Sequence, residues 1–590
     1  MSVPREVWNS LSRSSLATRV SIVLLAASLI GGVALRTVWL DQVPPGLHHD
    51  EACDAYDAYS ILLTGRDHHG NLLPVIAQGF NDYRMVLFDY SLVPLIGAFG
   101  LKPAVVRLGA AIWGSIDLVA VAIIAALTLG LPAAAIAVLL GALSPWHLAL
   151  SRYGIETTAA SATVSMAMAC FFLWLRRHND RWLLLSAAFF GLSLYSYAIT
   201  RAFTPLMILF LAHSYEREIE KARGPALAAL GILVLFATPH IIFFLLRPDE
   251  TLAPAKLLSI IHYTSTCPGC IISPDMAPPS LMVYLRNLGA NWLSFFTPSF
   301  LFLHGDRGDH WTMVHPSGFG QLLPAQALLI GLSLIALLDP RRRKLGFLLF
   351  GWLLCATLPA ALTIPLGIWN PEPGVASPSP WMLIDQSLPN QPLSASILLS
   401  HPDSRHAALA MVPWTLLSAL GFVVLLDLIP KARLVRGAVA VLLLAALLFS
   451  GAKFVKSYFR DYPSIAAPYF SYGMDEVVRA IRKFDDGRSP VVITDRMKMP
   501  YIFVLFFQRY NPSAFQRGPV FYGPGYSPPP ANSFAPVIAF DRYRFGDPGA
   551  AFSAAEHGIF VFARTETLPT YPALTVRYPD GSIAYNVVVK

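Results

Sequence analysis

The chain has 590 residues, of which 55% are hydrophobic and only 14% are charged. Its mean hydropathy of +0.53 excludes an ordinary soluble domain, because such domains carry roughly a quarter charged residues. The formal net charge of +8 comes from short basic segments between apolar runs, and not from a basic arm with interleaved aromatic residues. Nucleic acid is therefore not an expected partner. The composition predicts a multi-pass membrane protein.

Eleven apolar runs are candidates to cross a bilayer, which takes roughly 17–25 residues per helix. The run at 202–213 is short and is included because it makes the two sides alternate sensibly. The first run is not a cleaved signal, because it is long and lacks a small-residue cleavage site before Pro44-Pro45. The eleven predicted spans lie near 20–40, 104–129, 131–150, 158–175, 182–199, 202–213, 225–246, 322–338, 345–365, 407–429 and 433–450.

Basic residues indicate the orientation, because cytoplasmic loops are rich in Lys and Arg. Arg5, Arg13 and Arg19 precede the first span and place the N-terminus in the cytoplasm. The basic segments at 176–178, 221–223, 341–344 and 431–433 then fall on that same side. We expect a bacterial inner-membrane protein whose outer loops, at about 41–103, 248–321 and 366–406, face the periplasm together with everything after residue 450.

The chain is expected to have two parts, a membrane module at 1–450 and an extracytoplasmic α/β domain at 451–590. A helix is predicted at 473–484, and a hairpin at 574–585 turns at Pro579-Asp580-Gly581. Strands are predicted at 491–494, 537–540 and 559–563. Because this domain has no catalytic spacing, we expect it to be a lid or an accessory domain that contacts the acceptor.

Asp50-Glu51, directly behind the first span, is the most informative pair of residues. Carboxylates beside a membrane are costly to desolvate and usually serve a function. The alternative is that they only cap a helix, since carboxylates favour helix N-termini. The rest of the loop alternates short amphipathic pieces with Gly and Pro turns, which predicts interfacial helices.

The order of motifs in this region resembles the GT-C membrane glycosyltransferases of the protein O-mannosyltransferase and lipid A aminoarabinose transferase group, which is glycosyltransferase family 39-like. The motifs are Asp50-Glu51, the segments 64–70 and 81–84, then 143–147 and 151–156, and loosely Gly305-Asp306 with 318–320. The resemblance implies an α-helical GT-C fold, a polyprenyl-phosphate-linked sugar donor and inverting transfer. The chain departs from the family pattern at three places: Arg84 replaces a frequent Lys, Met85-Val86 replaces Pro-Pro, and Glu156 replaces a second Asp.

The chemistry of transfer suggests roles for these residues. Asp50 is the candidate general base that takes the proton of the acceptor, with Glu51 as its neighbour or substitute. Partial burial can raise the pKa of such a carboxylate and make it a better base. The departing phosphate needs fixed cations, for which the candidates are Arg84 and Arg152, with Arg66 and Arg201 behind them.

Other interpretations of these residues remain open. Arg152 and Glu156 are four residues apart, the spacing of an ion pair on one helix face. Arg84 also has the length to reach lipid headgroups. Asp117, inside the second span, is either functional or hydrogen-bonded between helices.

Histidines and cysteines in the outer loops raise the question of a metal. No group of them has the compact spacing of a zinc motif, so substrate binding or loop packing is expected, with a divalent cation as a possibility. Cys267 and Cys270 predict a local disulfide outside the cytoplasm, whereas Cys53 has no obvious partner. The histidines and nearby acids are His48, His49, His68 and His69, and His304, Asp306, Asp309, His310 and His315.

The sequence therefore predicts a cell-envelope glycosyltransferase of the GT-C fold with about eleven transmembrane helices. Its acceptor is a protein hydroxyl, a lipid or a cell-envelope glycan. One alternative is a transporter or flippase of lipid-linked sugars, which would show Gly- or Pro-broken spans in matched halves and ionisable residues near the midplane. Another is a scaffold or sensor in which the C-terminal domain is the active part.

Overall fold

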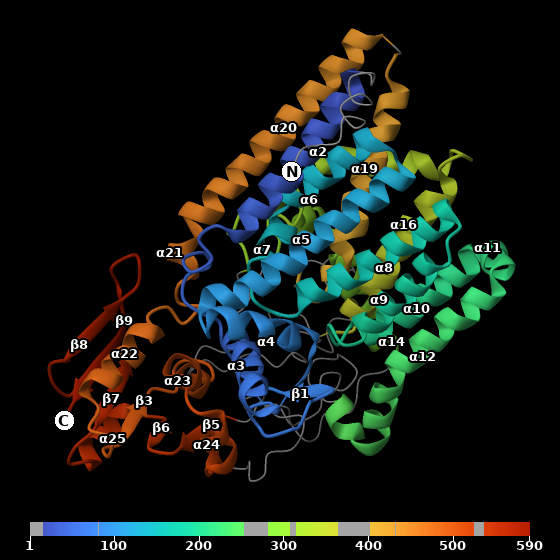
Figure 1. The fold of residues 1–590 in the computed structure, drawn as a ribbon. Coiled ribbons are helices and arrows are strands. Elements are labelled where there is room, and N and C mark those ends of the chain that lie inside the picture. Colours follow the sequence, from blue (N-terminus) through green and yellow to red (C-terminus); the bar gives the residue numbers. More distant parts are fainter. Residues whose placement is uncertain are drawn as a thin grey trace, which may run out of the picture.

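The structure of the chain is a computed structural model, shown in Figure 1. It describes residues 16–80, 82–252, 281–306, 314–363, 402–430, 432–523 and 536–590. Some residues with predicted roles lie outside the described ranges, and the predictions for them stay predictions. They are Asn81, Cys267, Cys270, Asp309 and His310.

Seven described helices are long and apolar enough to cross a membrane. They are α2 (Leu16–Thr37), α5 (Pro103–Thr128), α8 (Thr157–Arg177), α12 (Arg223–Leu246), α16 (Arg343–Ala361), α19 (Met411–Leu428, preceded by the turn η5, Ala408–Ala410) and α20 (Arg433–Arg460). The other four predicted runs form shorter helices, namely α6 (Leu131–Leu143), α9 (Arg181–Ser193), α10 (Thr200–Ser214) and α15 (Gln326–Ser333) with the turn η2 (Leu334–Leu337). Every predicted run thus coincides with a helix, while the number of membrane crossings stays a prediction.

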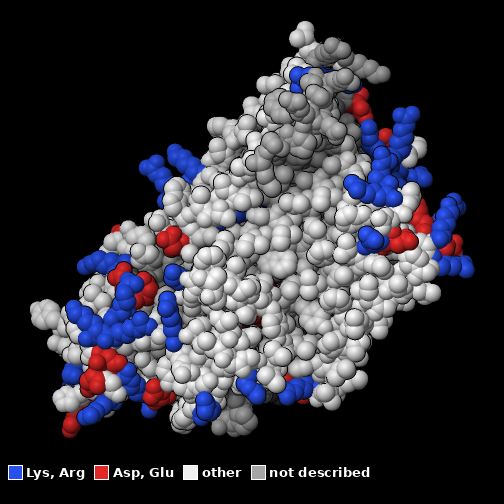
Figure 2. Space-filling view, in the orientation of Figure 1, with Lys and Arg blue, Asp and Glu red and all other residues white. Residues whose placement is uncertain are grey.

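The surface of the molecule agrees with a membrane location. Figure 2 shows a broad face almost without charged side chains, with Lys, Arg, Asp and Glu gathered at its two ends. Hydrocarbon contacts apolar side chains without penalty and excludes charge, so this face is the one that a bilayer would cover.

A buried polar network joins four helices inside the membrane module. Asp117 on α5 accepts hydrogen bonds from Ser161 Oγ (2.7 Å) and Ser165 Oγ on α8, and its Oδ2 lies 3.0 Å from His147 Nε2 on α7 (Pro145–Leu150). Arg36 Nη2 on α2 donates to His147 Nδ1 at 2.8 Å. A guanidinium can only donate, so His147 Nδ1 is the acceptor of this bond. The interhelical hydrogen-bonding alternative for Asp117 is therefore the correct one.

The first outer loop folds into two helices and a small hairpin between them. Helix α3 (His49–Thr64) is followed by strands β1 (Ile76–Gln78) and β2 (Tyr83–Met85), which pair antiparallel, and by α4 (Leu87–Phe99). Gly65 ends α3 with φ +69°, a conformation in which glycine avoids the Cβ clash of other residues. The second outer loop holds α14 (Leu281–Ser294) and the π-turn η1 (Ser299–Leu303) among its described residues.

The C-terminal part is an α/β domain around one mixed sheet of seven strands in the order β4-β5-β6-β3-β7-β9-β8. Strand β3 pairs parallel with β6 and β7, and the remaining pairs are antiparallel. The predicted helix, strands and closing hairpin are all present. The helices are α21 (Tyr462–Ala466), α22 (Met474–Phe484), α23 (Pro500–Gln508), α24 (Pro512–Arg517) and α25 (Pro548–Ala554), and the strands are β3 (Val491–Ile493), β4 (Val520–Tyr522), β5 (Val537–Phe540), β6 (Tyr543–Phe545), β7 (Ile559–Ala563), β8 (Leu574–Arg577) and β9 (Ile583–Val589).

The C-terminal domain is docked on the first outer loop through a common hydrophobic core. Buried residues of α3, α4 and the start of α5 form one cluster with those of α22, α23 and the sheet. Tyr56 Oη on α3 donates to Tyr510 O (2.8 Å), and Gln516 Nε2 donates to Ser60 Oγ (3.0 Å) and Asp67 O (2.8 Å). An apolar contact of this kind holds the domain against α3 and α4.

Candidate active site

The Asp50-Glu51 pair stands at the start of α3, where His48 is the N-cap. His48 Nδ1 accepts from Asp50 N at 3.2 Å, and Glu51 Oε2 accepts from His48 N at 2.9 Å, so the two side chains form a capping box. The capping alternative thus holds for Glu51. Asp50, at the preceding position, lies beside His48 and His49.

Glu51 is buried and engaged in a network of hydrogen bonds. Its carboxylate is 0% exposed and accepts four hydrogen bonds, from Arg107 Nε and Nη2, from Gly154 N and from His48 N, each at 2.9 Å. Arg107 also donates to the carbonyl oxygens of Leu40, Pro44 and Gly46. This burial favours Asp50 over Glu51 as the candidate base, because the Glu51 carboxylate has no exposed surface for an acceptor.

Asp50 is the carboxylate that remains accessible, with 30% of its side chain exposed. His48 Nδ1 and His49 Nε2 lie 3.4 and 3.6 Å from its oxygens. Burial raises the pKa of Asp50, but His49, His48 and Arg405 outweigh it and hold the pKa well below its usual range. This corrects the expectation of a raised pKa. Asp50 is ionised at every physiological pH.

Arg405 is the main cation near Asp50, and the sequence interpretation missed it. Its Nη2 donates to Asp403 Oδ2 at 2.9 Å, its side chain is 16% exposed, and it interacts with Tyr153 as well as Asp50. It belongs to the polar segment 402–406 immediately before the predicted span at 407–429. The signal that could have identified Arg405 is the block of charged residues directly before this predicted span.

The segment that carries Arg405 is fastened by several of the motif residues. Ser404 N and Oγ donate to the two oxygens of Asp306 at 2.9 and 2.5 Å, and Trp146 Nε1 donates to Ser404 O at 3.0 Å. Gln321 Nε2 donates to Asp306 Oδ1 at 3.0 Å. At Gly320 a Cβ would come within 2.3 Å of the Phe302 backbone, so only glycine allows this approach. The motifs at 143–147, 305–306 and 318–320 therefore position Arg405.

Lys498 is a second cation at the site, and it comes from the C-terminal domain. It lies in the connection between β3 and α23, where His49, Asp50 and Arg405 are its electrostatic neighbours. The residue is exposed, yet desolvation by the surrounding protein lowers the pKa of Lys498 to about 7, against the opposing effect of Asp50. An ammonium that titrates near neutrality thus faces the candidate base.

Glu156 lies in the same charged neighbourhood and is not paired with Arg152. Burial raises the pKa of Glu156, Arg84 opposes the shift, and the charge of Asp50 adds to it. Asp50 and Glu156 are therefore two carboxylates whose surroundings drive their pKa values apart, an arrangement typical of acid–base sites.

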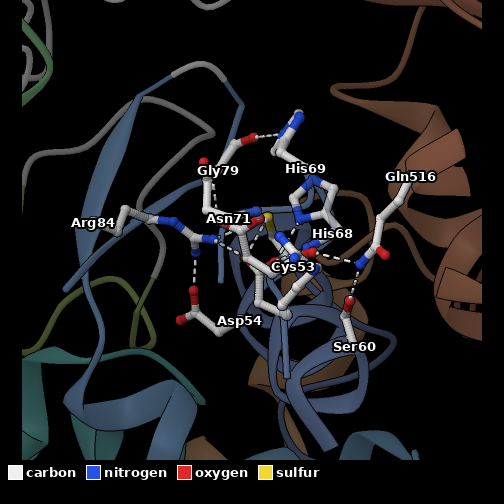
Figure 3. A network of polar contacts seen from close by, with 12 residues as sticks. Cys53, Asp54, Ser60, His68, His69, Asn71, Gly79, Arg84 and Gln516 are labelled. Atoms are coloured by element: carbon white, nitrogen blue, oxygen red, sulfur yellow. Dashed lines mark hydrogen bonds and ion pairs between the residues drawn. The ribbon is translucent and has the colours of Figure 1, made fainter. Parts of the chain in front are cut away.

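Arg84 and Arg152 are committed elsewhere. Arg84 is buried and binds Asp54, Asp57 Oδ2 (3.2 Å) and Cys53 Sγ (2.9 Å). Figure 3 shows Arg84 beside Asp54 and Cys53. Arg152 donates to the carbonyl oxygens of Leu35, Trp39 and Val43 and stacks over the ring of Phe459. In this arrangement both guanidinium groups contact protein atoms, and their role in phosphate binding stays a prediction.

Arg66 and Arg201 also hold backbone carbonyls. Arg66 Nη1 donates to Gly70 O at 2.7 Å, and Arg201 Nη1 donates to Thr251 O at 3.2 Å. The structure therefore does not bring them to Asp50. Their basic side chains were visible in the sequence, but their partners are set by the local fold.

Two groups of potential metal ligands occur among the described residues. His48, His49 and Asp50 form one, and Cys53, Asp57 and His68 form the other, with ligand atoms within 4.8 Å of one another. A cation already lies beside each group: Arg405 and Lys498 act on the first, and Arg84 Nη2 contacts Cys53 and Asp57 in the second. Because like charges repel, these side chains oppose the binding of a divalent cation, and the predicted possibility of such a cation stays a prediction.

Comparisons with known proteins agree with this architecture. Residues 91–243 match the family model described as dolichyl-phosphate-mannose-protein mannosyltransferase. The crystal structure of ArnT from Cupriavidus metallidurans bound to undecaprenyl phosphate aligns over 96% of this chain and 97% of its own, with a TM-score of 0.51 and 11% sequence identity. AglB from Archaeoglobus fulgidus, in complex with an inhibitory peptide and a dolichol-phosphate, aligns over 82% of this chain and 63% of its own, with a TM-score of 0.46 and 14% identity.

The chain thus has the fold of a GT-C membrane glycosyltransferase, as the sequence predicted. Within that class, its segment 91–243 carries the pattern of the dolichyl-phosphate-mannose-protein mannosyltransferase family. No curated protein sequence matches the chain. The candidate site is therefore defined by the contacts, burial and charges of its own residues.

Proposed function

We propose that this protein transfers a sugar from a polyprenyl-phosphate-linked donor to an acceptor on the outer face of the bacterial inner membrane. The observation that carries this proposal is the accessible, ionised Asp50 with the cations Arg405 and Lys498 in its immediate surroundings. A base beside fixed cations is what phosphate displacement needs. The fold shared with an undecaprenyl-phosphate-bound protein supports this class of donor.

In the proposed reaction the acceptor oxygen attacks the anomeric carbon of the donor from the side opposite the phosphate. The bond from this carbon to the phosphate oxygen breaks as the bond to the acceptor forms, which inverts the anomeric centre. The acceptor proton passes to Asp50. A carboxylate of low pKa suffices, because the acceptor oxygen grows acidic as its new bond forms.

The released polyprenyl phosphate carries the negative charge that develops in the reaction. Arg405 and Lys498 stabilise that charge, and Asp403 and Asp306 keep Arg405 in place. Glu156 is positioned to bind sugar or acceptor hydroxyls. We also propose that no divalent cation takes part, since Arg405 and Lys498 already supply positive charge. Sugar and acceptor remain open; the acceptor is a protein hydroxyl, a lipid or a cell-envelope glycan.

The test is sugar transfer by the full-length protein in membranes, using membranes that contain the native donor pool. Asp50→Asn should slow transfer by about 100-fold or more, the range of a lost general base. Asp41→Asn is the matched control, since Asp41 is an exposed aspartate of the same outer loop, and it should behave as the wild type. Full transfer by Asp50→Asn would refute the assignment.

The acceptor is identified by mass spectrometry of envelope glycans, lipids and proteins from cells with and without the gene. A sugar that disappears from one class of molecule names both donor and acceptor. Movement of lipid-linked sugar across the membrane with no such change would instead indicate a transporter.

A further inference from the structure

A cavity of about 180 Å³ lies outside the candidate active site, between helix α20 and the segment 318–324. Its walls are apolar and include Phe302, Phe319, Leu323 and Phe449. Water would fill this volume with roughly six molecules at about 30 Å³ each, but walls of this kind give water few hydrogen-bond partners. The cavity is therefore suited to hydrocarbon.

The position of the cavity along α20 places it at the depth of lipid headgroups. Helix α20 starts at Arg433, and at 1.5 Å per residue its Lys453 lies about 30 Å further on, one hydrocarbon thickness. Phe449, one turn before Lys453, is 75% exposed on the lipid-facing side. In the orientation indicated by the basic loops, the mouth of the cavity meets the outer leaflet. Figure 1 shows α20 running along the membrane module toward the C-terminal domain.

The charge of the cavity selects the kind of lipid. Among its described lining residues the polar side chains are Ser450 and Lys453, and none is acidic. The Lys453 ammonium lies 5.9 Å from the centre of the Phe319 ring, above the apolar walls. An acyl chain below an anionic headgroup matches this pattern, because a basic residue at the membrane surface attracts anionic lipid.

We propose that this cavity binds an acyl chain of an anionic phospholipid from the outer leaflet, with the lipid phosphate on Lys453. The site touches the segment that supports Arg405: Gly320 lines the cavity, and the next residue, Gln321, donates to Asp306 and accepts from Trp146 N (3.1 Å). Bound lipid packs against this segment. It therefore stabilises the protein in a way that depends on the lipid headgroup.

The proposal is tested without turnover, on the purified full-length protein, by native mass spectrometry of retained lipids and by thermal unfolding with added phosphatidylglycerol or phosphatidylcholine. Lys453→Ala should retain about fivefold less phosphatidylglycerol and lose its stabilisation by that lipid. Ser450→Phe should fill the cavity and exclude lipid of either kind. Lys456→Ala is the matched control, because Lys456 is an exposed lysine of the same helix and does not line the cavity.

The outcomes separate cleanly. Wild-type behaviour of Lys456→Ala together with loss in the other two variants supports the site. The proposal would be overturned by an equal loss of phosphatidylglycerol in Lys456→Ala, or by undiminished lipid retention in Ser450→Phe. It would also be overturned if phosphatidylglycerol and phosphatidylcholine stabilised the wild-type protein equally. Retention of polyprenyl phosphate in place of phospholipid would also overturn it and reassign the cavity to the sugar carrier. Unfolding without added lipid, compared with the wild type, shows that each variant is folded.

Discussion

Replacing Glu51 by Gln should unfold the protein more easily, while replacing its neighbour Asp50 by Asn should not. Gln keeps the size of Glu51 but turns one of the two carboxylate oxygens into an NH₂ group. On Oε2 that group would face two donors, Arg107 Nη2 and His48 N. Arg107 would also lose its buried counter-charge. Breaking a buried ion pair from one side costs about 3–5 kcal/mol.

The measurement is the free energy of unfolding in mixed micelles, followed by tryptophan fluorescence as denaturing detergent is added. Asp50→Asn should stay within about 1 kcal/mol of the wild type, since its side chain is partly exposed and contributes mainly through the helix N-terminus. Because Glu51 and Asp50 are adjacent, each variant is the control for the other.

A double variant sharpens the test. Arg107→Met combined with Glu51→Gln removes the uncompensated charge, so the loss of stability should be clearly smaller than the sum of the two single losses. Wild-type unfolding of Glu51→Gln, together with a loss of transfer as large as that of Asp50→Asn, would refute the structural role and make Glu51 a chemical participant.

Three further predictions concern the cations of the site. Arg405→Met should reduce the rate of sugar transfer by about 10²–10³-fold, the range for a lost charge-stabilising group. The control is Arg66→Met, which should retain wild-type transfer because the Arg66 side chain bonds to its own turn. Equal losses of transfer in the two variants would show that Arg405 is not part of the site. Transfer should fall as pH rises through about 7, because the pKa of Lys498 is lowered to about 7 and the ammonium is charged only below that value. Lys498→Arg should extend activity to higher pH, and a pH profile identical to the wild type would contradict this role. Dialysis against a chelator should leave the transfer rate unchanged, whereas a loss restored by added divalent metal would show that His48, His49 and Asp50 bind a cation.

The fold was predictable to the extent that it depends on local patterns. Apolar runs long enough to span a membrane, the Pro-Asp-Gly turn at 579–581 and the helical spacing at 474–484 are decided by neighbouring residues, and all appear as helices or hairpin. Helix α23 was missed, because its run Pro500–Gln508 is apolar on every side. A segment without a polar face gives no periodic signal, and its structure depends on the elements packed against it, here α3.

The site was predictable only in part, because the partner of a charge is a tertiary property. The sequence pointed to Asp50 and Glu156, yet it gave no means to distinguish Asp50 from Glu51, whose partner Arg107 is 56 residues away. Likewise, Arg84 is buried and paired with carboxylates of α3, while Arg405 comes from a segment more than 300 positions after Arg84. Hydropathy identifies which charges are unusual, and only packing decides which of them meet.

The common core between α3 and α23 has a consequence for how the protein is made. The residues that cover α3 and supply Lys498 are synthesised some 450 positions after Asp50 and, in the predicted orientation, have to be exported before they can fold. Until then the apolar face of α3 is uncovered and the base stands without one of its cations. The proposed active site is therefore the last part of the protein to be completed. A chain released before α23 would be inserted in the membrane but inactive, a built-in safeguard against sugar transfer by unfinished protein.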